Sequence, residues 1–204
     1  MKMRMEEEEP KKTEVVVEEK PSLSLQDKLL KARTIQITGQ VDDKQAARVV
    51  SELLLLEADD PEAPITLFLN SPGGSVTAGF AIYDTIRFIK PRVRTVCNGL
   101  TASIATVILL ASKKEDRLSL PNTRLLIHQP LIPMTVYGPA SDLEITANEI
   151  LKTRAKVNAL LAAETGQDLA RIEKDTQRDY WLTAEEAVKY GLLARVIATR
   201  AEIQ

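Results

Sequence analysis

The sequence predicts an α/β domain with a mostly parallel sheet, because strand patterns and helix patterns alternate from residue 22 onward. The stretch ITLFLN (65–70) reads as a buried strand, and further strand patterns precede and follow it. No internal repeat of fixed period is visible in the 204 residues, a length that suits one domain with a sizeable core.

The first helix and strand patterns lie before that buried strand. Ser24 is a candidate cap for a short helix through Ala32, and TIQIT (34–38) predicts a strand. A helix near 43–57 follows, with Asp42 as its candidate N-cap. The predicted buried face of this helix consists of Ala46, Val49, Val50, Leu53 and Leu56.

Turn and strand patterns continue after the buried strand. The turn SPGG (71–74) opens a helix that we expect to end near Ile89. VRTVC (93–97) predicts the next strand, and a loop (98–100) joins it to the apolar helix ASIATVILLAS. RLLIH (124–128) predicts another strand.

The stretch SDLEITANEILKTRAKVNALLAAETG predicts a helix of roughly 23 residues, which is about 35 Å long at 1.5 Å per residue. We expect it to begin with a capping box, Ser141 with Glu144, and to end at Gly166. Because this length exceeds the diameter of a small core, we expect part of the helix to pack on another subunit. A long surface helix on its own domain is the alternative. The apolar stripe consists of Leu143, Ala147, Ile150, Val157 and Leu161, widened by Ile145, Leu151 and Leu160.

Composition and charge narrow the class of protein. Apolar residues make up 44% and charged residues 27%, as in ordinary globular proteins. The net charge of −2 predicts no nucleic-acid binding, and without an apolar run of 18 residues we expect no membrane contact. Cys97 is the one cysteine, so no intrachain disulfide can form, and we expect a cytoplasmic protein.

Residues 1–21 differ from the rest of the chain. They are charge-blocked, carry two prolines, and offer apolar surface only at Val15–Val17, so they predict a mobile tail. The alternative is an arm that orders against a partner. The tail lacks the apolar region of a signal peptide and is too acidic for a transit peptide. We expect residues 22–204 to form a single domain.

Ser103, in the stretch GLTASIAT, is a candidate nucleophile. It follows a predicted strand and begins a predicted helix, the place where sites form in α/β sheets. A hydroxyl there lies beside free N–H groups and the positive end of the helix dipole, which suits a reaction that builds an oxyanion. The alternative is a serine that only caps the helix.

The turn SPGGS (71–75) also joins a buried strand to a helix. Pro72 fixes one φ angle, and the two glycines allow close approach of a ligand to the backbone. The pattern GxxxxGK[ST] is absent, so this is no phosphate-binding loop. Gly73 and Gly74 could present N–H donors to a substrate carbonyl, unless the turn binds nothing.

The chain has one histidine, His128, at the end of a predicted strand. A serine nucleophile needs a base of near-neutral pKa, so if a histidine activates Ser103 it must be His128. A carboxylate that orients the imidazole would complete the set. DTQRDYWLT offers Asp175 and Asp179, and the pattern alone does not choose between them.

Several separated blocks of the sequence together resemble the proteolytic subunit of the ATP-dependent Clp protease. They are NSPGGSVTAG, GLTAS, LIHQP, EILKTRAKVN, TGQ and DTQRDYWLTAEEAVKYGLL, and the resemblance runs from about Leu29 to Val196. It implies a serine peptidase with the α/β fold shared with crotonases, and a protruding handle helix in a region of about 129–166.

The resemblance also implies site residues. The nucleophile would be Ser103, the base His128 and the acid Asp179. The oxyanion donors would be the backbone N–H groups of Gly74 and Ile104. It implies no cofactor and no metal in this subunit.

The resemblance further implies partners and a role in protein quality control. We expect homo-oligomeric seven-membered rings stacked into a tetradecamer, unfolded proteins as substrates, and an AAA+ unfoldase that uses the ATP. Phe68 and Phe88 fall at positions of the apolar docking cleft, with core packing as the alternative for each. Two other functions remain open: a catalytically weak ring partner of another Clp peptidase subunit, and a crotonase-like acyl-CoA enzyme.

The chain departs from the family pattern at several places. Thr101 and Ile104 replace smaller or more flexible residues, and the segment 131–140 replaces a glycine-rich one. Gln177 stands where an acidic residue commonly pairs with the arginine that follows it, here Arg178. We expect these changes to affect specificity and ring pairing, and the acidic tail to affect docking of the unfoldase.

Overall fold

A mainly parallel sheet forms the centre of the molecule. The computed structural model describes residues 23–131 and 137–203, so the predicted tail (1–21) lies outside the described residues. Within them, strands pair in the order β1-β2-β3-β4-β7, while β5 pairs with β3, and β6 with β5 in the one antiparallel pair. The strands are β1 (Thr34–Thr38), β2 (Ile65–Ser71), β3 (Val93–Ala102), β4 (Arg117–Ser119), β5 (Arg124–Ile127), β6 (Tyr180–Thr183) and β7 (Arg195–Val196).

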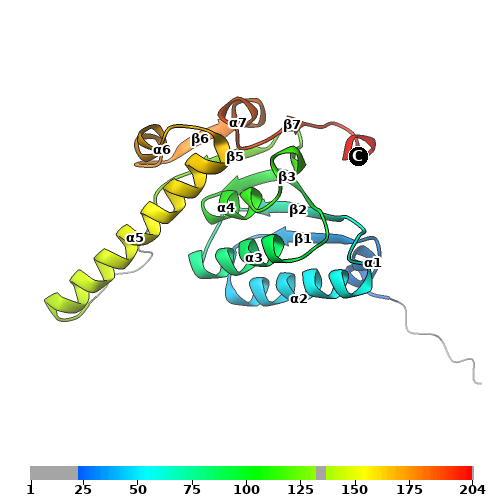
Figure 1. Cartoon of the computed structure of the whole chain (residues 1–204), viewed down its shortest axis with the longest axis horizontal. Helices are drawn as coiled ribbons and strands as arrows, with labels where there is room; N and C mark the ends of the chain where they lie inside the picture. Colours follow the sequence, from blue (N-terminus) through cyan, green and yellow to red (C-terminus); the bar gives the residue numbers. More distant parts are fainter. Residues whose placement is uncertain (1–22, 132–136, 204) are drawn as a thin grey trace, which may run out of the picture.

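Helices pack on the sheet, and one helix extends away from it. In Figure 1, α2 and α3 lie together along the sheet, whereas α5 runs away from it. The predicted α/β class is therefore confirmed. The helices of the described residues are α1 (Leu25–Lys31), α2 (Asp43–Asp59), α3 (Val76–Phe88), α4 (Ile104–Leu110), α5 (Ala140–Thr165), α6 (Leu169–Asp175) and α7 (Ala184–Tyr190), with two 3₁₀ turns at Lys114–Asp116 and Arg200–Ile203.

The core lies between the sheet and the helices that cover it. Alternate residues of β2, namely Ile65, Leu67 and Leu69, have no exposed surface, and they belong to the same hydrophobic cluster as the buried side chains of α2. Burial of such side chains stabilises the fold by roughly 1.5–3 kcal/mol each. Strand β2 is therefore the buried strand that the run ITLFLN predicts.

The first half of the chain follows the predicted elements closely. Ser24 caps α1 in a capping box with Asp27, and β1 spans the predicted residues. The Asp42 side chain caps α2 by accepting the N–H of Gln45. On the predicted face of α2, Val50 is only half-buried, and Glu52 is buried there in addition.

Two predicted boundaries were wrong. The strand expected at 93–97 continues through the expected loop to Ala102, because Asn70 Oδ1 accepts the N–H of Leu100 at 3.1 Å and a register shift in β2 keeps the two strands paired. The capping box of Ser141 with Glu144 does not form. Helix α5 begins at Ala140 after Pro139, whose φ of −55° already suits a helix start.

Only part of helix α5 packs against other described residues. Toward its C-terminal end Val157 and Leu161 are buried in the core, and Gly166 ends the helix in the left-handed conformation. Toward its N-terminal end Ile145 and Leu151 are 62% and 57% exposed. The predicted apolar stripe is therefore half buried and half uncovered within the described part of this chain.

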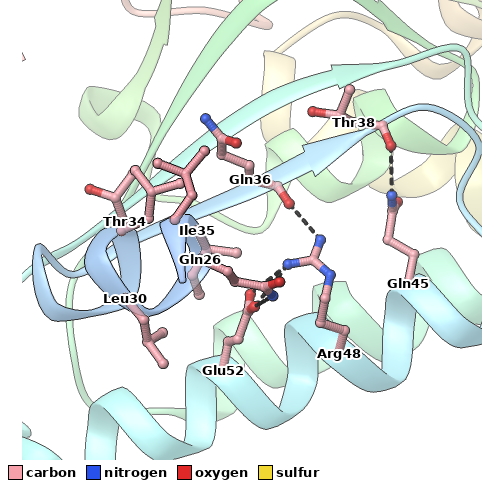
Figure 2. Close-up of a pocket in the computed structure, with 11 residues that line it drawn as sticks. Gln26, Leu30, Thr34, Ile35, Gln36, Thr38, Gln45, Arg48 and Glu52 are labelled. Atoms are coloured by element: carbon pink, nitrogen blue, oxygen red, sulfur yellow. Dashed lines mark hydrogen bonds and ion pairs between the residues drawn. The ribbon is translucent and has the colours of Figure 1, made fainter. Parts of the chain in front are cut away.

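Side chains of α2 cover the free edge of β1. The carbonyl of Gln36 accepts a hydrogen bond from Arg48 Nη2 at 2.6 Å, and that of Thr38 accepts one from Gln45 Nε2 at 2.8 Å (Figure 2). Glu52 in turn holds the Arg48 guanidinium with both carboxylate oxygens. Polar cover of this kind blocks unwanted pairing at an edge strand.

Arg117 is a fully buried cation, and its replacement by methionine is expected to destabilise the fold. Its guanidinium donates to the carbonyls of Leu110, Ser112 and Glu164 and pairs with the Glu164 carboxylate. Because Arg117→Met leaves these acceptors unpaired, we expect the free energy of unfolding to fall by about 3 kcal/mol in denaturant titrations.

The matched control for Arg117 is Arg171→Met. The Arg171 side chain is 52% exposed and pairs with Asp175 at 3.5 Å, so we expect a loss below about 1 kcal/mol. Equal losses for the two variants would contradict the structural role of the buried cation.

Candidate active site

Ser103 lies at the sharp turn between β3 and α4. Its φ of 58° and ψ of −127° are a strained conformation for a residue with a side chain. Its N–H donates to the carbonyl of Leu126 in β5 at 2.9 Å, which anchors the turn. Within residues 23–131 and 137–203 its hydroxyl makes no capping bond to the helix, so the capping alternative finds no support.

The SPGG turn between β2 and α3 packs directly against this serine. A Cβ built on Gly73 would lie 2.7 Å from Ser103 Cβ and 3.2 Å from Ser103 Oγ. The turn is held in place because Val41 donates to the carbonyl of Gly73, and Ser75 donates to that of Val41. The turn between β2 and α3 therefore contacts the turn between β3 and α4, and Gly74 lies next to this contact.

The N–H groups of Gly74 and Ile104 are free to donate. Within the described residues neither group has a hydrogen-bond acceptor. Ile104 is the first residue of α4, so its N–H is one of the groups that a helix start leaves unpaired. Both predicted donors thus come from the two turns that meet at Ser103.

The structure brings His128 to Ser103. Strand β5 pairs with the end of β3, with Leu126 opposite Ala102, so the residues that follow each strand lie side by side. His128 Nε2 lies 2.8 Å from Ser103 Oγ, and His128 Nδ1 lies 3.0 Å from Asp179 Oδ1. Since a carboxylate only accepts, we assign the ring proton to Nδ1, which leaves Nε2 able to accept from the serine.

The geometry also separates the two candidate aspartates. Asp179 lies against the histidine, whereas Asp175 accepts from the Tyr190 hydroxyl at 2.9 Å and pairs with Arg171. Burial, together with the bond to this carboxylate, raises the pKa of Tyr190, which keeps the phenol protonated as a donor. Asp175 is therefore engaged elsewhere.

Gln129 is a residue whose role the sequence patterns did not predict. Its N–H donates to the carbonyl of Thr176 at 2.7 Å, and its side chain donates to the carbonyl of Gln177 at 2.9 Å. These bonds tie the segment after β5 to the segment that carries Asp179. The only sequence signal for this contact is that Gln129 directly follows His128.

The chain's one thiol is not a rival nucleophile. Cys97 is fully buried in β3, and burial raises the pKa of its thiol to about 12. A thiol that stays protonated and has no access to solvent cannot attack a substrate, so the serine is the nucleophile candidate at this end of the sheet.

An apolar pocket opens beside Ser103. Ile104 lines it, as do Val157 and Leu161 from α5. Thr101, the other departure near the serine, does not line this pocket. Its side chain is buried, and its hydroxyl donates to the carbonyl of Leu69 in the neighbouring strand. Of the predicted departures next to the nucleophile, Ile104 is therefore the one that shapes the site.

A larger cavity, of about 510 Å³, lies between α1, β1 and α2 (Figure 2). Its main charged groups are Arg48 and Glu52, which are already paired with each other. Neither Ser103 nor His128 lines it. Ser103 and His128 both line the smaller pocket, and His128 also lines a cavity of about 390 Å³ together with Asp179.

The two turns bring the hydroxyl of Ser103 and the imidazole of His128 together, an arrangement that is chemically able to carry out acyl transfer. A family model described as Clp protease matches residues 18–200, and the chain belongs to this family. The mainly parallel sheet with its helices agrees with the Clp protease fold. Members of the family are proteolytic subunits, hydrolases that assemble in rings. In the described part of the chain, no helix has both the length and the apolar character needed to cross a membrane.

Replacing Gly73 by alanine is expected to disturb the site directly. The new Cβ would lie 2.7 Å from Ser103 Cβ and 2.8 Å from the carbonyl of Ala102, in a backbone conformation with φ of +95°. Because the serine must shift, we expect kcat for peptide hydrolysis to fall about 100-fold. Gly166→Ala is the matched control, since φ there is +79° and no atom lies within 4 Å of the new Cβ. Equal activity of the two variants would contradict a site built on this contact.

Proposed function

We propose that this chain is the serine endopeptidase subunit of a self-compartmentalising, ATP-dependent protease. The observation that carries the proposal is the pair of contacts from one histidine, 2.8 Å to Ser103 Oγ and 3.0 Å to Asp179 Oδ1. Family membership supports proteolysis in general, and this geometry supports serine chemistry in particular.

The proposed reaction begins with proton transfer. His128 takes the proton of Ser103 through Nε2, and the serine oxygen attacks the carbonyl carbon of a peptide bond. Asp179 holds the imidazole in the required tautomer and stabilises the imidazolium that forms. The unpaired N–H groups of Gly74 and Ile104 receive the oxyanion, and loss of one such donor costs about 3–4 kcal/mol of transition-state stabilisation.

The second half of the reaction restores the enzyme. His128⁺ protonates the leaving amine, and water then enters and gives its proton to the same nitrogen. The resulting hydroxide attacks the carbonyl carbon of the acyl-enzyme. The bond to Ser103 then breaks, the peptide product leaves with a new carboxyl group, and His128⁺ returns the proton to the serine oxygen. Nothing in this cycle requires a cofactor or a metal from this subunit.

Assembly into heptameric rings, stacked as a tetradecamer, is part of the proposal. The uncovered N-terminal half of α5, with exposed Ile145 and Leu151, supports it as the handle that contacts another subunit. A partner AAA+ unfoldase would use the ATP and feed unfolded chains. Phe88, which is 81% exposed, is available for such docking, whereas Phe68 is half-buried against Val96, Leu118 and Ile197.

Two other functions compete with this one. A catalytically weak ring partner is motivated by Ile104, by Gln177 and by the segment 131–140, of which 132–136 lie outside the described residues. The complete set of serine, histidine and aspartate argues against it. A crotonase-like acyl-CoA enzyme would use the same two N–H donors but has no need of the serine–histidine pair.

One assay separates the three functions. The purified, ring-assembled protein is incubated with fluorogenic peptides, with an unfolded protein and with an acyl-CoA, each without ATP. We expect cleavage of short peptides and no turnover of the acyl-CoA, because peptides need no unfoldase to reach the site. Assembled rings that leave every peptide intact would favour the inactive ring partner, and acyl-CoA turnover would favour the crotonase-like enzyme.

A further inference from the structure

Strands β2 and β3 lose their regular register just before the two turns of the site. In an unbroken ladder Ser71 would pair with Gly99, but it pairs with Thr101, so residues 98–100 of β3 lie opposite Asn70 alone. Extra residues on one strand leave backbone groups without a ladder partner. A group other than the backbone of β2 must therefore hold β3 at this bulge.

The side chain of Asn70 supplies the missing partner. Its Oδ1 accepts the N–H of Leu100 at 3.1 Å. A Cβ on Gly99 would lie 2.9 Å from the same oxygen, so any larger residue there would displace the amide. The backbone carbonyl of Asn70 accepts the N–H of Gly39 at 3.0 Å, which anchors the residue on the side of β1. The amide is therefore fixed at its base and bridges β2 to β3.

Both turns of the site begin within a few residues of this bridge. The buried hydroxyl of Ser71 accepts the N–H of Gly73 at 3.0 Å, which ties the SPGG turn to the end of β2. Strand β3 runs on from Leu100 to Ala102 and enters the other turn at Ser103. The position of one turn relative to the other therefore depends on how the ends of β2 and β3 are held together.

We propose that Asn70 is a positioning residue, which sets the spacing between the N–H donors of Gly74 and Ile104 by bridging the strands that carry them. The inference rests on the proposed peptidase function and adds a residue that acts through the backbone of its neighbours. A second side-chain link between these strands, from the Thr101 hydroxyl to the carbonyl of Leu69, is longer at 3.4 Å and so weaker. An oxyanion needs both donors at roughly 2.7–3.1 Å, so a small change in spacing weakens at least one of the two bonds.

Asn70→Ala in the full-length, ring-assembled protein tests the role of the bridge. Because the ends of β2 and β3 then shift relative to one another, we expect kcat for peptide hydrolysis to fall on the order of 10- to 100-fold, with KM within about twofold of the wild type. Asn70→Asp keeps an oxygen acceptor of the same shape in the same place, so we expect its kcat to stay within about fivefold of the wild type. Equal losses in the two variants would overturn the inference.

A tetrahedral inhibitor separates positioning from a general loss of binding. A peptide aldehyde forms a bond from its carbonyl carbon to Ser103 Oγ and so resembles the transition state, whereas the corresponding peptide alcohol binds only as a ground-state analogue. For Asn70→Ala we expect the affinity for the aldehyde to fall by the same factor as kcat/KM, while the affinity for the alcohol stays within about twofold. Equal weakening of both would contradict a role in placing the donors.

The matched control is Thr95→Val, which removes a different side-chain hydrogen bond of β3. The buried Thr95 hydroxyl lies 2.7 Å from the Ser112 hydroxyl, at the end of β3 that is remote from the bulge. We expect this variant to lose at least as much in Tm as Asn70→Ala and to keep the kcat of the wild type. A kcat that falls in step with Tm in both variants would overturn the inference.

The two proposals fail in different ways. If the wild type cleaves peptides and Asn70→Ala cleaves them equally fast, the inference about Asn70 is wrong and the peptidase function stands. Absence of cleavage by the wild type, together with absence of any aldehyde adduct at Ser103, overturns both.

Discussion

Ser103→Ala is expected to lower kcat for peptide hydrolysis by about 10⁴- to 10⁶-fold, with KM nearly unchanged. The hydroxyl is the only group of this residue that takes part in the reaction, while the N–H donors and the pocket remain. Fluorogenic peptide hydrolysis by purified rings measures the effect. Gel filtration of the variant should show the same assembly as the wild type.

Ser103→Gly serves as the companion variant. The conformation with φ of 58° and ψ of −127° is strained for serine and alanine but is readily adopted by glycine. We therefore expect Ser103→Gly to be inactive yet more stable than Ser103→Ala by about 1 kcal/mol, or roughly 2–4 °C in Tm. Activity in either variant would remove Ser103 from the mechanism, and a lower Tm for the glycine variant would contradict the strain.

Asp179→Asn is expected to cause the second large loss of peptide hydrolysis. The side-chain amide of asparagine is neutral, so the imidazolium loses the negative charge that stabilises it. The amide can also donate to Nδ1, so the tautomer with the proton on Nδ1 is no longer favoured. We expect kcat to fall about 10²- to 10⁴-fold, toward the lower figure because the Asp179 side chain is 63% exposed and water replaces part of its role.

Asp175→Asn is the matched control. It makes the same chemical change four residues away, at a carboxylate bound to Tyr190 and Arg171 rather than to His128. We expect its kcat to equal that of the wild type. If the two variants lose similar activity, or if Asp175→Asn loses more, the assignment of Asp179 as the orienting acid is wrong.

Much of the fold could be predicted from local patterns because its main strands and helices are locally consistent. The alternating burial of β2 and the caps of α1 and α2 are of this kind. The short strands β4, β6 and β7 span 3, 4 and 2 residues, too few for a periodic pattern, and they exist because neighbouring strands pair with them.

The end of β3 illustrates a different limit. Asn98 and Gly99 read as a loop by propensity, and Gly99 does have a positive φ of 82°. The chain nevertheless stays in the sheet, because the Asn70 side chain accepts the N–H of Leu100 from the neighbouring strand. Such a contact between distant residues leaves no local pattern.

The candidate site, like the fold, could be predicted only in part from the sequence. Ser103 stands at a strand-to-helix junction, and His128 is the one histidine, so their pairing could be expected from the residues alone. The choice of Asp179 over Asp175 could not, because it depends on Tyr190 holding one carboxylate and on Gln129 drawing the other segment toward the histidine. The size of the apolar pocket depends on the packing of three helices and could not be predicted from the sequence.

Location of a fluorophosphonate adduct by mass spectrometry tests the proposed alignment of Ser103, His128 and Asp179 most directly. The reagent reacts only with a serine that a neighbouring base has activated, and it reports on the nucleophile without requiring turnover or an unfoldase. We expect stoichiometric modification of Ser103 in the intact protein and loss of the adduct in His128→Ala. Assembled protein that remains unmodified, or modification at another serine, would contradict the proposal.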